Sequence, residues 1–142
     1  MNAEPKLFSI DEANRMLPLV SVIVRDVRTT FREYTAGKKE LGQLRRSAVT
    51  GSDDAAARRT LDEKEAEVRT LSDELKALVR ELTALDALLR DPIRGVVDFP
   101  FERDGSTAYL CWQFGEKSIT TWHTAEAGFA GRQPLEPVAP PA

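Results

Sequence analysis

The chain has 142 residues, of which 42% are hydrophobic and 30% are charged, and its formal net charge at pH 7 is −3. This length and composition favour one compact domain with a packed core and exclude disorder throughout. The small negative charge gives no general attraction to nucleic acid or to an anionic membrane surface, so neither partner is expected.

The first residues, "MNAEPKLFSIDEAN", have neither the basic nor the apolar region of a secretory signal. No apolar run approaches the roughly 20 residues that cross a bilayer. The single cysteine, Cys111, cannot form a disulfide within the chain. We therefore expect a cytoplasmic protein without a membrane-spanning segment.

Two long helices are predicted, over residues 8–46 and 53–90. The first opens with a capping box, because Ser9 precedes Glu12 by three residues. Pro18 predicts a kink, or a break followed by a second helix. Apolar residues recur at heptad spacing, at Val20, Val27, Tyr34 and Leu41 in the first helix and at Leu61, Val68, Leu75, Leu82 and Leu89 in the second. The short connection predicts an antiparallel, coiled-coil-like hairpin.

A pair of helices cannot bury two wide apolar stripes by itself. Either the C-terminal part of the chain or a second copy of the protein must cover the remainder, and we favour a homodimer through the helices. Packing within one chain is the alternative interpretation of the same heptads.

The apolar period changes from about 3.5 to 2 near residue 95, which predicts a small three-stranded antiparallel β-meander over residues 95–124. Asp104-Gly105 is typical of a type I′ turn, and Gly115-Glu116 of a type II′ turn with glycine first. A glycine-rich loop over residues 125–135 and a proline-rich tail over 136–142 follow. The fold class is therefore α+β, with the meander packed on the helical hairpin and residues 1–135 forming a single domain.

Two-residue turns would fix the register of the meander, with Asp98 opposite Cys111 and Ala108 opposite His123. Side chains alternate between the faces of a strand. The face toward the helices would then hold Leu110, Trp112, Ile119, Thr121 and His123, and the other face Asp98, Tyr109, Cys111, Thr120 and Trp122. This separation of Cys111 from His123 argues against a closed metal site and against a Cys–His nucleophile pair.

Polar residues near the C-terminal end supply the candidate site. Histidine titrates near neutral pH, which suits a role in a pocket, and an arginine on a glycine-rich loop suits a carboxylate or a phosphate. The structural alternatives are that His123 caps a strand and that Arg132 pairs with Asp98 or Glu116. The candidate ligand-binding residues are His123, Arg132, Glu116, Asp98, Glu12 and Trp122. No metal or cofactor is assigned, and His123, Glu116 and Cys111 are the weak candidates for metal ligands.

Three blocks, "FSIDEANRMLP", "GVVDFP" and "LCWQFGEKSITTWHTAEAGFAGRQPL", resemble a bacterial family of uncharacterised proteins, domain of unknown function 2203. The resemblance extends over about residues 7–135 and implies no activity, substrate or cofactor. It does imply that a shared role would lie at the polar positions of these motifs. Those positions are Glu12, Asn14, Asp98, Cys111, Glu116, His123 and Arg132.

Two functions stay open at this point. The favoured one is a non-enzymatic homodimeric protein for binding or assembly. The alternative is a small-molecule-binding protein or an enzyme, with a polar site around His123 and Arg132 in which a metal could take part. Whether the chain is an enzyme is left open.

Overall fold

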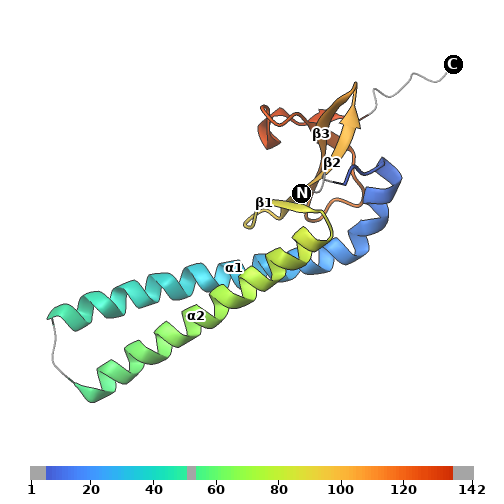
Figure 1. Ribbon diagram of the computed structural model, residues 1–142. Coiled ribbons are helices and arrows are strands. Elements are labelled where there is room, and N and C mark those ends of the chain that lie inside the picture. Colours follow the sequence, from blue (N-terminus) through green and yellow to red (C-terminus); the bar gives the residue numbers. More distant parts are fainter. Residues whose placement is uncertain (1–5, 51–53, 136–142) are drawn as a thin grey trace, which may run out of the picture.

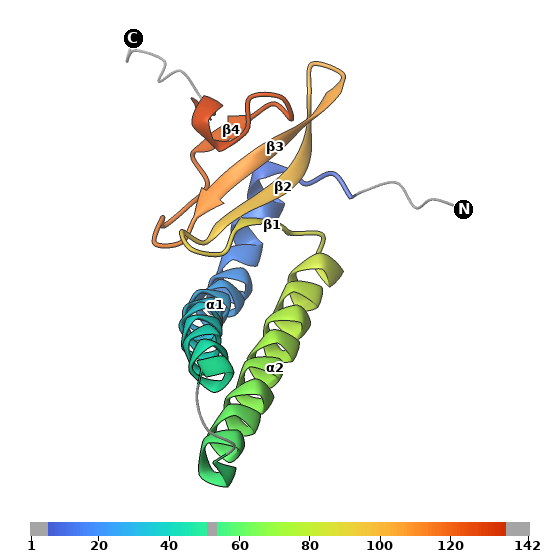
Figure 2. The same cartoon turned by 90° about the vertical axis from the view of Figure 1, so that its left-hand side faces the viewer.

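The structure, a computed structural model, describes residues 6–50 and 54–135, so the predicted proline-rich tail lies outside the described residues. The elements in chain order are α1 (Ile10–Thr50), α2 (Ala55–Ala84), β1 (Leu88–Asp91), β2 (Val96–Arg103), β3 (Ser106–Gln113), β4 (Thr121–His123), the 3-10 turn η1 (Phe129–Gly131) and β5 (Gln133–Pro134). Figures 1 and 2 show the two helices as a hairpin, with the sheet at the end where α1 begins and α2 ends. The predicted α+β class and helical hairpin are confirmed.

Helix α1 begins with the predicted capping box. The Ser9 N–H donates to Glu12 Oε1 at 2.9 Å, and the Glu12 N–H donates to Ser9 Oγ at 3.0 Å. Pro18 lies inside a continuous helix of 41 residues. Figure 1 shows the dark-blue first turns inclined to the rest of α1, as a proline within a helix leads one to expect.

The two helices pack closely along their antiparallel seam. A Cβ atom on Gly37 would lie only 3.1 Å from Val68 Cγ2, so this glycine permits the close approach. Lys64, which interrupts the heptads of α2, pairs with Glu40 of α1 at 2.7 Å. Hydrogen bonds with Glu40 and Glu67 raise the pKa of Lys64 to about 12.

Helix α2 ends at Ala84, so the prediction of helix up to residue 90 is wrong. Asp86 adopts a φ of 62°, and its N–H donates to Thr83 O while the Ala87 N–H donates to Leu82 O. These two bonds form a Schellman motif, with aspartate where glycine is usual. The heptad leucines continue past this end, and the residues from Leu88 onward form strand β1 instead.

The sheet has five antiparallel strands in the order β1-β2-β3-β4-β5, and not the three predicted. The two extra strands lie at its edges: β1 comes from the predicted helix and β5 from the predicted loop. One face of the sheet packs on α1 and the end of α2. The buried core includes Val97, Phe99, Leu110, Trp112 and Trp122 from the sheet and Leu17, Val20, Val24, Val27 and Leu82 from the helices.

The first hairpin has the predicted register, with Asp98 opposite Cys111 and a turn in which Asp104 and Gly105 both have positive φ, 52° and 82°. The register predicted for the second hairpin, between β3 and β4, is wrong by one residue. Tyr109 lies opposite His123, and Cys111 lies opposite Thr121.

The cause of this shift is the connection between β3 and β4. Gly115, with a φ of 101°, is the second central residue of a turn that the Glu116 N–H closes by donating to Gln113 O at 3.0 Å. The chain then runs on without pairing, and the Ile119 N–H donates to Asn14 Oδ1 on α1 at 2.8 Å. The predicted two-residue II′ turn is therefore wrong.

A shift of one residue moves every side chain of β4 to the opposite face. Trp122 joins the core, where its ring meets Phe101 edge-on at 6.2 Å between centroids. Thr121 and His123 lie on the outer face with Cys111. The predicted separation of Cys111 from His123 is thus overturned.

Candidate functional site

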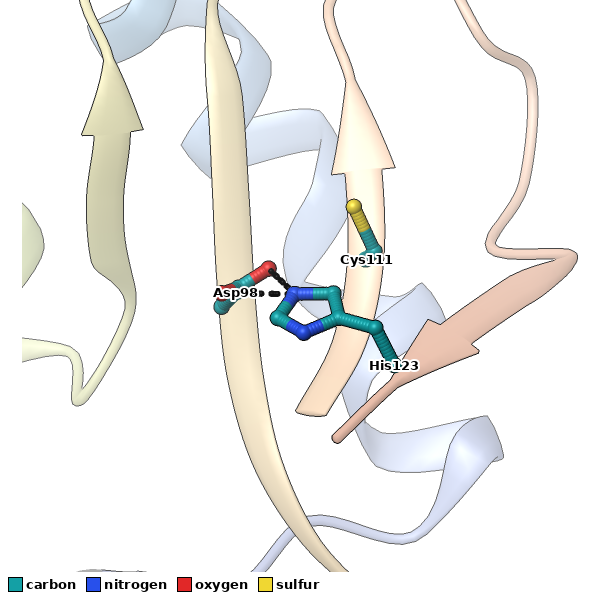
Figure 3. A group of neighbouring side chains, drawn as sticks. All are labelled: Asp98, Cys111 and His123. Atoms are coloured by element: carbon teal, nitrogen blue, oxygen red, sulfur yellow. Dashed lines mark hydrogen bonds and ion pairs between the residues drawn. The ribbon is translucent and has the colours of Figure 1, made fainter. Parts of the chain in front are cut away.

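Three buried side chains from three neighbouring strands meet on the outer face of the sheet (Figure 3). They are Asp98 on β2, Cys111 on β3 and His123 on β4, and one ligand atom from each lies within 4.8 Å of the others. Asp98 and Cys111 are 0% exposed and His123 is 4% exposed. The rigid ladder of paired strands, and not a mobile loop, positions the group.

Both nitrogens of the His123 ring face oxygen acceptors. Nδ1 lies 2.7 Å from the carbonyl oxygen of Thr124, and Nε2 lies 2.9 Å from both carboxylate oxygens of Asp98. A carbonyl oxygen can only accept, so Nδ1 carries a hydrogen. A proton or another cation must therefore lie between Nε2 and the carboxylate, and a proton on Nε2 would make the two an imidazolium–carboxylate ion pair.

Arg90 completes the contacts of the buried carboxylate. Its Nε donates to Asp98 Oδ2 at 2.8 Å from a side chain that is 46% exposed. The guanidinium also lies over the Tyr109 ring, 5.1 Å from its centroid, and Tyr109 stacks on the His123 ring at 5.6 Å. One ion pair and two ring contacts thus hold the group in place.

The Cys111 thiol is not an activated nucleophile. Burial, followed by the negative charge of Asp98, raises the pKa of Cys111 to about 12. The thiol therefore keeps its proton at neutral pH, and the attacking species of cysteine catalysis, the thiolate, is scarce. The register argument against a Cys–His pair no longer holds, and the raised pKa of the thiol is the argument that remains against one.

A cavity of about 320 Å³ lies over this group on the outer face. His123 faces this cavity on the outer face of the sheet, and not the helices as the predicted register implied. The residues that line the cavity include Asp98, His123, Arg90, Tyr109, Ala125 and Phe129. Gly128, with a φ of 62°, also lines it and shapes the loop that carries Phe129. Buried ionisable groups and aromatic walls that meet in one cavity are typical of a binding site.

Arg132 and Glu116 form a neighbouring pair outside this cavity. Arg132 Nη2 donates to Glu116 Oε2 at 2.8 Å, and its Nε donates to Thr121 Oγ1 at 3.0 Å. The other oxygen of Glu116 accepts from the Gln113 N–H at 2.6 Å. Arg132 therefore pins the glycine-rich loop to the β3–β4 connection, which is the structural alternative that the sequence offered.

The remaining predicted site residues lie elsewhere. Glu12 is part of the capping box of α1 and also pairs with Lys6 at 3.6 Å. Trp122 lies in the core, with Arg103 over its ring at 4.1 Å. Of the six predicted ligand-binding residues, the cavity brings together His123 and Asp98.

Sequence reasoning missed Arg90 as a site residue, because the predicted second helix extended through it. The predicted face of Tyr109 and Cys111 is correct, and the polar side chain of Asp98 within the otherwise apolar residues 96–101 is a signal for a buried ion pair. His123 could join them only once the register of β4 was known.

No helix of the described residues combines the length and the apolar character that crossing a membrane requires. Comparison with curated proteins and with solved structures finds no match. A family model described as "Uncharacterized conserved protein (DUF2203)" matches residues 6–135, which include every residue of the buried group and its cavity. By this match over nearly its whole length, the chain belongs to the DUF2203 family of uncharacterised conserved proteins.

Proposed function

We propose that the chain is a binding protein for a small organic anion, and that the cavity on the outer face of the sheet is its site. The observation that carries the proposal is the position of two buried ionisable side chains, Asp98 and His123, in the lining of a cavity of about 320 Å³. The raised pKa of the Cys111 thiol argues against cysteine catalysis at this site.

The charges around the cavity favour an anion. Arg90 lines the cavity beside Asp98, the one carboxylate among the lining residues, and a proton on Nε2 of His123 would add a second positive charge. The Arg94 guanidinium lies 5.7 Å from the centroid of the Phe129 ring that forms one wall, with Asp91 as its ion-pair partner at 4.0 Å. Arginine is well suited to hold a carboxylate or phosphate group.

The walls and the size favour an organic ligand. The rings of Tyr109 and Phe129 and the side chain of Val96 give the cavity apolar surface beside its charged groups. Since one water molecule occupies about 30 Å³ in the liquid, the cavity has room for roughly ten non-hydrogen atoms.

Three probes that share a phenyl ring and differ in charge test the proposal: benzoate, benzyl alcohol and benzylamine. Titration followed by the amide NMR signals of the protein should show binding in the order benzoate, benzyl alcohol, benzylamine. The shifted signals should belong to residues 90–98, 109–111 and 123–129. Equal affinity for all three probes, or NMR signal shifts confined to other segments of the chain, would refute an anion site at this cavity.

Ala125→Leu supplies the matched variant, because Ala125 lines the cavity and is itself exposed. The larger side chain fills the space without removing a charged group, and we expect it to weaken benzoate binding at least tenfold. Ala130→Leu is the control, since Ala130 is exposed on η1 and is not among the lining residues. Equal benzoate affinity in both variants would contradict the proposal.

We also propose that the chain forms a homodimer, as the heptads predict. Support comes from apolar side chains that α1 leaves exposed, Leu19 at 51% and Val22 at 46%, and from Ile93 at 68% in the β1–β2 turn. Light scattering at high protein concentration should give twice the chain mass of 15.8 kDa. A mass of one chain under these conditions would refute the dimer and leave the cavity proposal untouched.

A further inference from the structure

We propose that Asp98, Cys111 and His123 bind one zinc ion at the floor of the cavity, through a carboxylate oxygen, Sγ and Nε2. The inference deepens the proposed function and rests on it for the role of the ion, which is to complete the floor that receives the organic anion.

The placement of the three donors on the sheet supports this inference. Cys111 is the cross-strand partner of Asp98, and its other neighbour, Thr121, is two residues from His123 on the same face. The three donor atoms lie within 4.8 Å of one another. Donor atoms around tetrahedral zinc lie roughly 3.5 Å apart. The 2.9 Å contact between Nε2 and the carboxylate would therefore widen slightly, and donor contacts as long as 4.8 Å would shorten by about 1 Å.

The hydrogen bonds around the donors have the pattern of supported metal ligands. The Thr124 carbonyl holds Nδ1 at 2.7 Å and so directs Nε2 to the group. Arg90 holds one oxygen of Asp98 at 2.8 Å. Ligating histidines generally donate their second N–H to a carbonyl or carboxylate, and ligating carboxylates are themselves hydrogen-bonded. Nε2 and the carboxylate would otherwise be two acceptors facing each other, which requires a proton or a cation between them.

The donor types favour zinc. One thiolate, one imidazole and one carboxylate are three of the groups that commonly bind this ion. Three protein ligands leave one coordination position for water or for an added anion. Asp98 and His123 line the cavity, so this fourth position would face it.

The charges balance when zinc replaces two protons. The proton on Nε2 and the proton of the Cys111 thiol pass to solvent as the metal–nitrogen and metal–sulfur bonds form. Two positive charges leave and two arrive, so the net charge of Arg90, Asp98, Cys111 and His123 is unchanged.

Cobalt(II) is the direct probe, because it substitutes for zinc and absorbs light. The full chain is treated with a chelator, dialysed and titrated with Co²⁺. We expect a thiolate-to-cobalt charge-transfer band that saturates at one ion per chain and is abolished by one equivalent of Zn²⁺. Cys111 is the chain's only cysteine, so such a band reports on this sulfur.

Cys111→Ser should remove the band and weaken zinc binding by more than the roughly 10- to 100-fold that follows loss of a residue that only supports a ligand. Glu116→Gln is the control, because Glu116 pairs with Arg132 beside the group and supplies none of its donors. Circular dichroism checks that both variants fold. If a variant does not fold, the unaltered chain alone decides the question. Absence of the charge-transfer band from the unaltered chain overturns the inference.

The outcomes separate this inference from the proposed function. A binding site for benzoate that is sensitive to Ala125→Leu, without a cobalt band, would overturn the zinc site alone. A cobalt band at one ion per chain, without benzoate binding by the zinc-loaded chain, would overturn the anion site alone.

Discussion

A shift of one residue in the pairing of β4 with β3 decides which side chains surround His123. On the outer face it meets Asp98 and Cys111, whereas the predicted pairing would have placed it among the core side chains. The single polar residue buried in the middle of β2, Asp98, has two charged or polar partners there, Arg90 and His123. A buried carboxylate needs such partners, because burial of an unpaired charge is strongly unfavourable.

Trp112 tests the packing of the core face. The side chain is 1% exposed, and its indole Nε1 donates to the Glu116 carbonyl at 2.9 Å. Replacement by alanine should lower the free energy of unfolding by about 3–5 kcal/mol, measured by urea denaturation. Leu7→Ala, at a position that is 45% exposed, is the control and should change stability by less than about 0.5 kcal/mol. Similar effects of the two changes would contradict the assigned face.

Glu12 tests the capping box through pH. The Ser9 backbone N–H, and next the Ser9 side chain, lower the pKa of Glu12 below its ordinary value of 4.5. The folded state therefore favours the ionised carboxyl, and the resulting stability is present above pH 4.5 and is lost as the pH falls through the lowered pKa. Glu12→Gln keeps an acceptor but does not titrate.

The measurement is the free energy of unfolding of the unaltered chain minus that of Glu12→Gln, followed as the pH is lowered from about 7 to about 3. This difference should shrink toward the acid end, since the other carboxyl groups titrate in both proteins and cancel. A difference that stays constant, or grows, would show that the Glu12 carboxyl gains no stabilisation from its charge.

At the scale of elements, the sequence predicted what local patterns determine. Heptads gave the two helices, Ser9 and Glu12 gave the start of α1, and Asp104-Gly105 gave the first hairpin with its register. The sequence did not predict the end of α2, because Asp86 replaces the usual glycine and Leu89 continues the heptads.

The sequence also did not predict the β3–β4 connection, because the Ile119 N–H is bound by Asn14, 105 residues away in the chain. The site depends on that long-range contact.

Two glycines of α1 test the helix seam. A Cβ atom on Gly37 would lie 3.1 Å from Val68 Cγ2, whereas on Gly42 the nearest group is the flexible end of Arg46 at 3.4 Å. Gly42→Ala should raise the free energy of unfolding by about 1 kcal/mol through helix propensity. Gly37→Leu should lower it by about 1–3 kcal/mol through crowding of the seam. Urea denaturation compares them, and a stabilising Gly37→Leu would contradict the close approach.

At the scale of the molecule, the helical hairpin supports the sheet and the outer face of the sheet holds the site. One face of the sheet packs on α1 and α2, and the opposite face carries the buried group of Asp98, Cys111 and His123 with its cavity. The family match extends over both parts, from residue 6 to residue 135. The packing of the sheet on the helices and the cavity on its outer face can therefore be tested separately. Substitution of Trp112 tests the packing, and substitution of Ala125 tests the cavity.

The most direct test of the zinc site is anomalous diffraction from a crystal of the full chain grown with Zn²⁺, measured on both sides of the zinc absorption edge. We expect one peak on the outer face of the sheet, about 2.3 Å from Cys111 Sγ and about 2.0 Å from His123 Nε2. A map without a peak there, with Nε2 still bonded directly to the Asp98 carboxylate, would contradict the account.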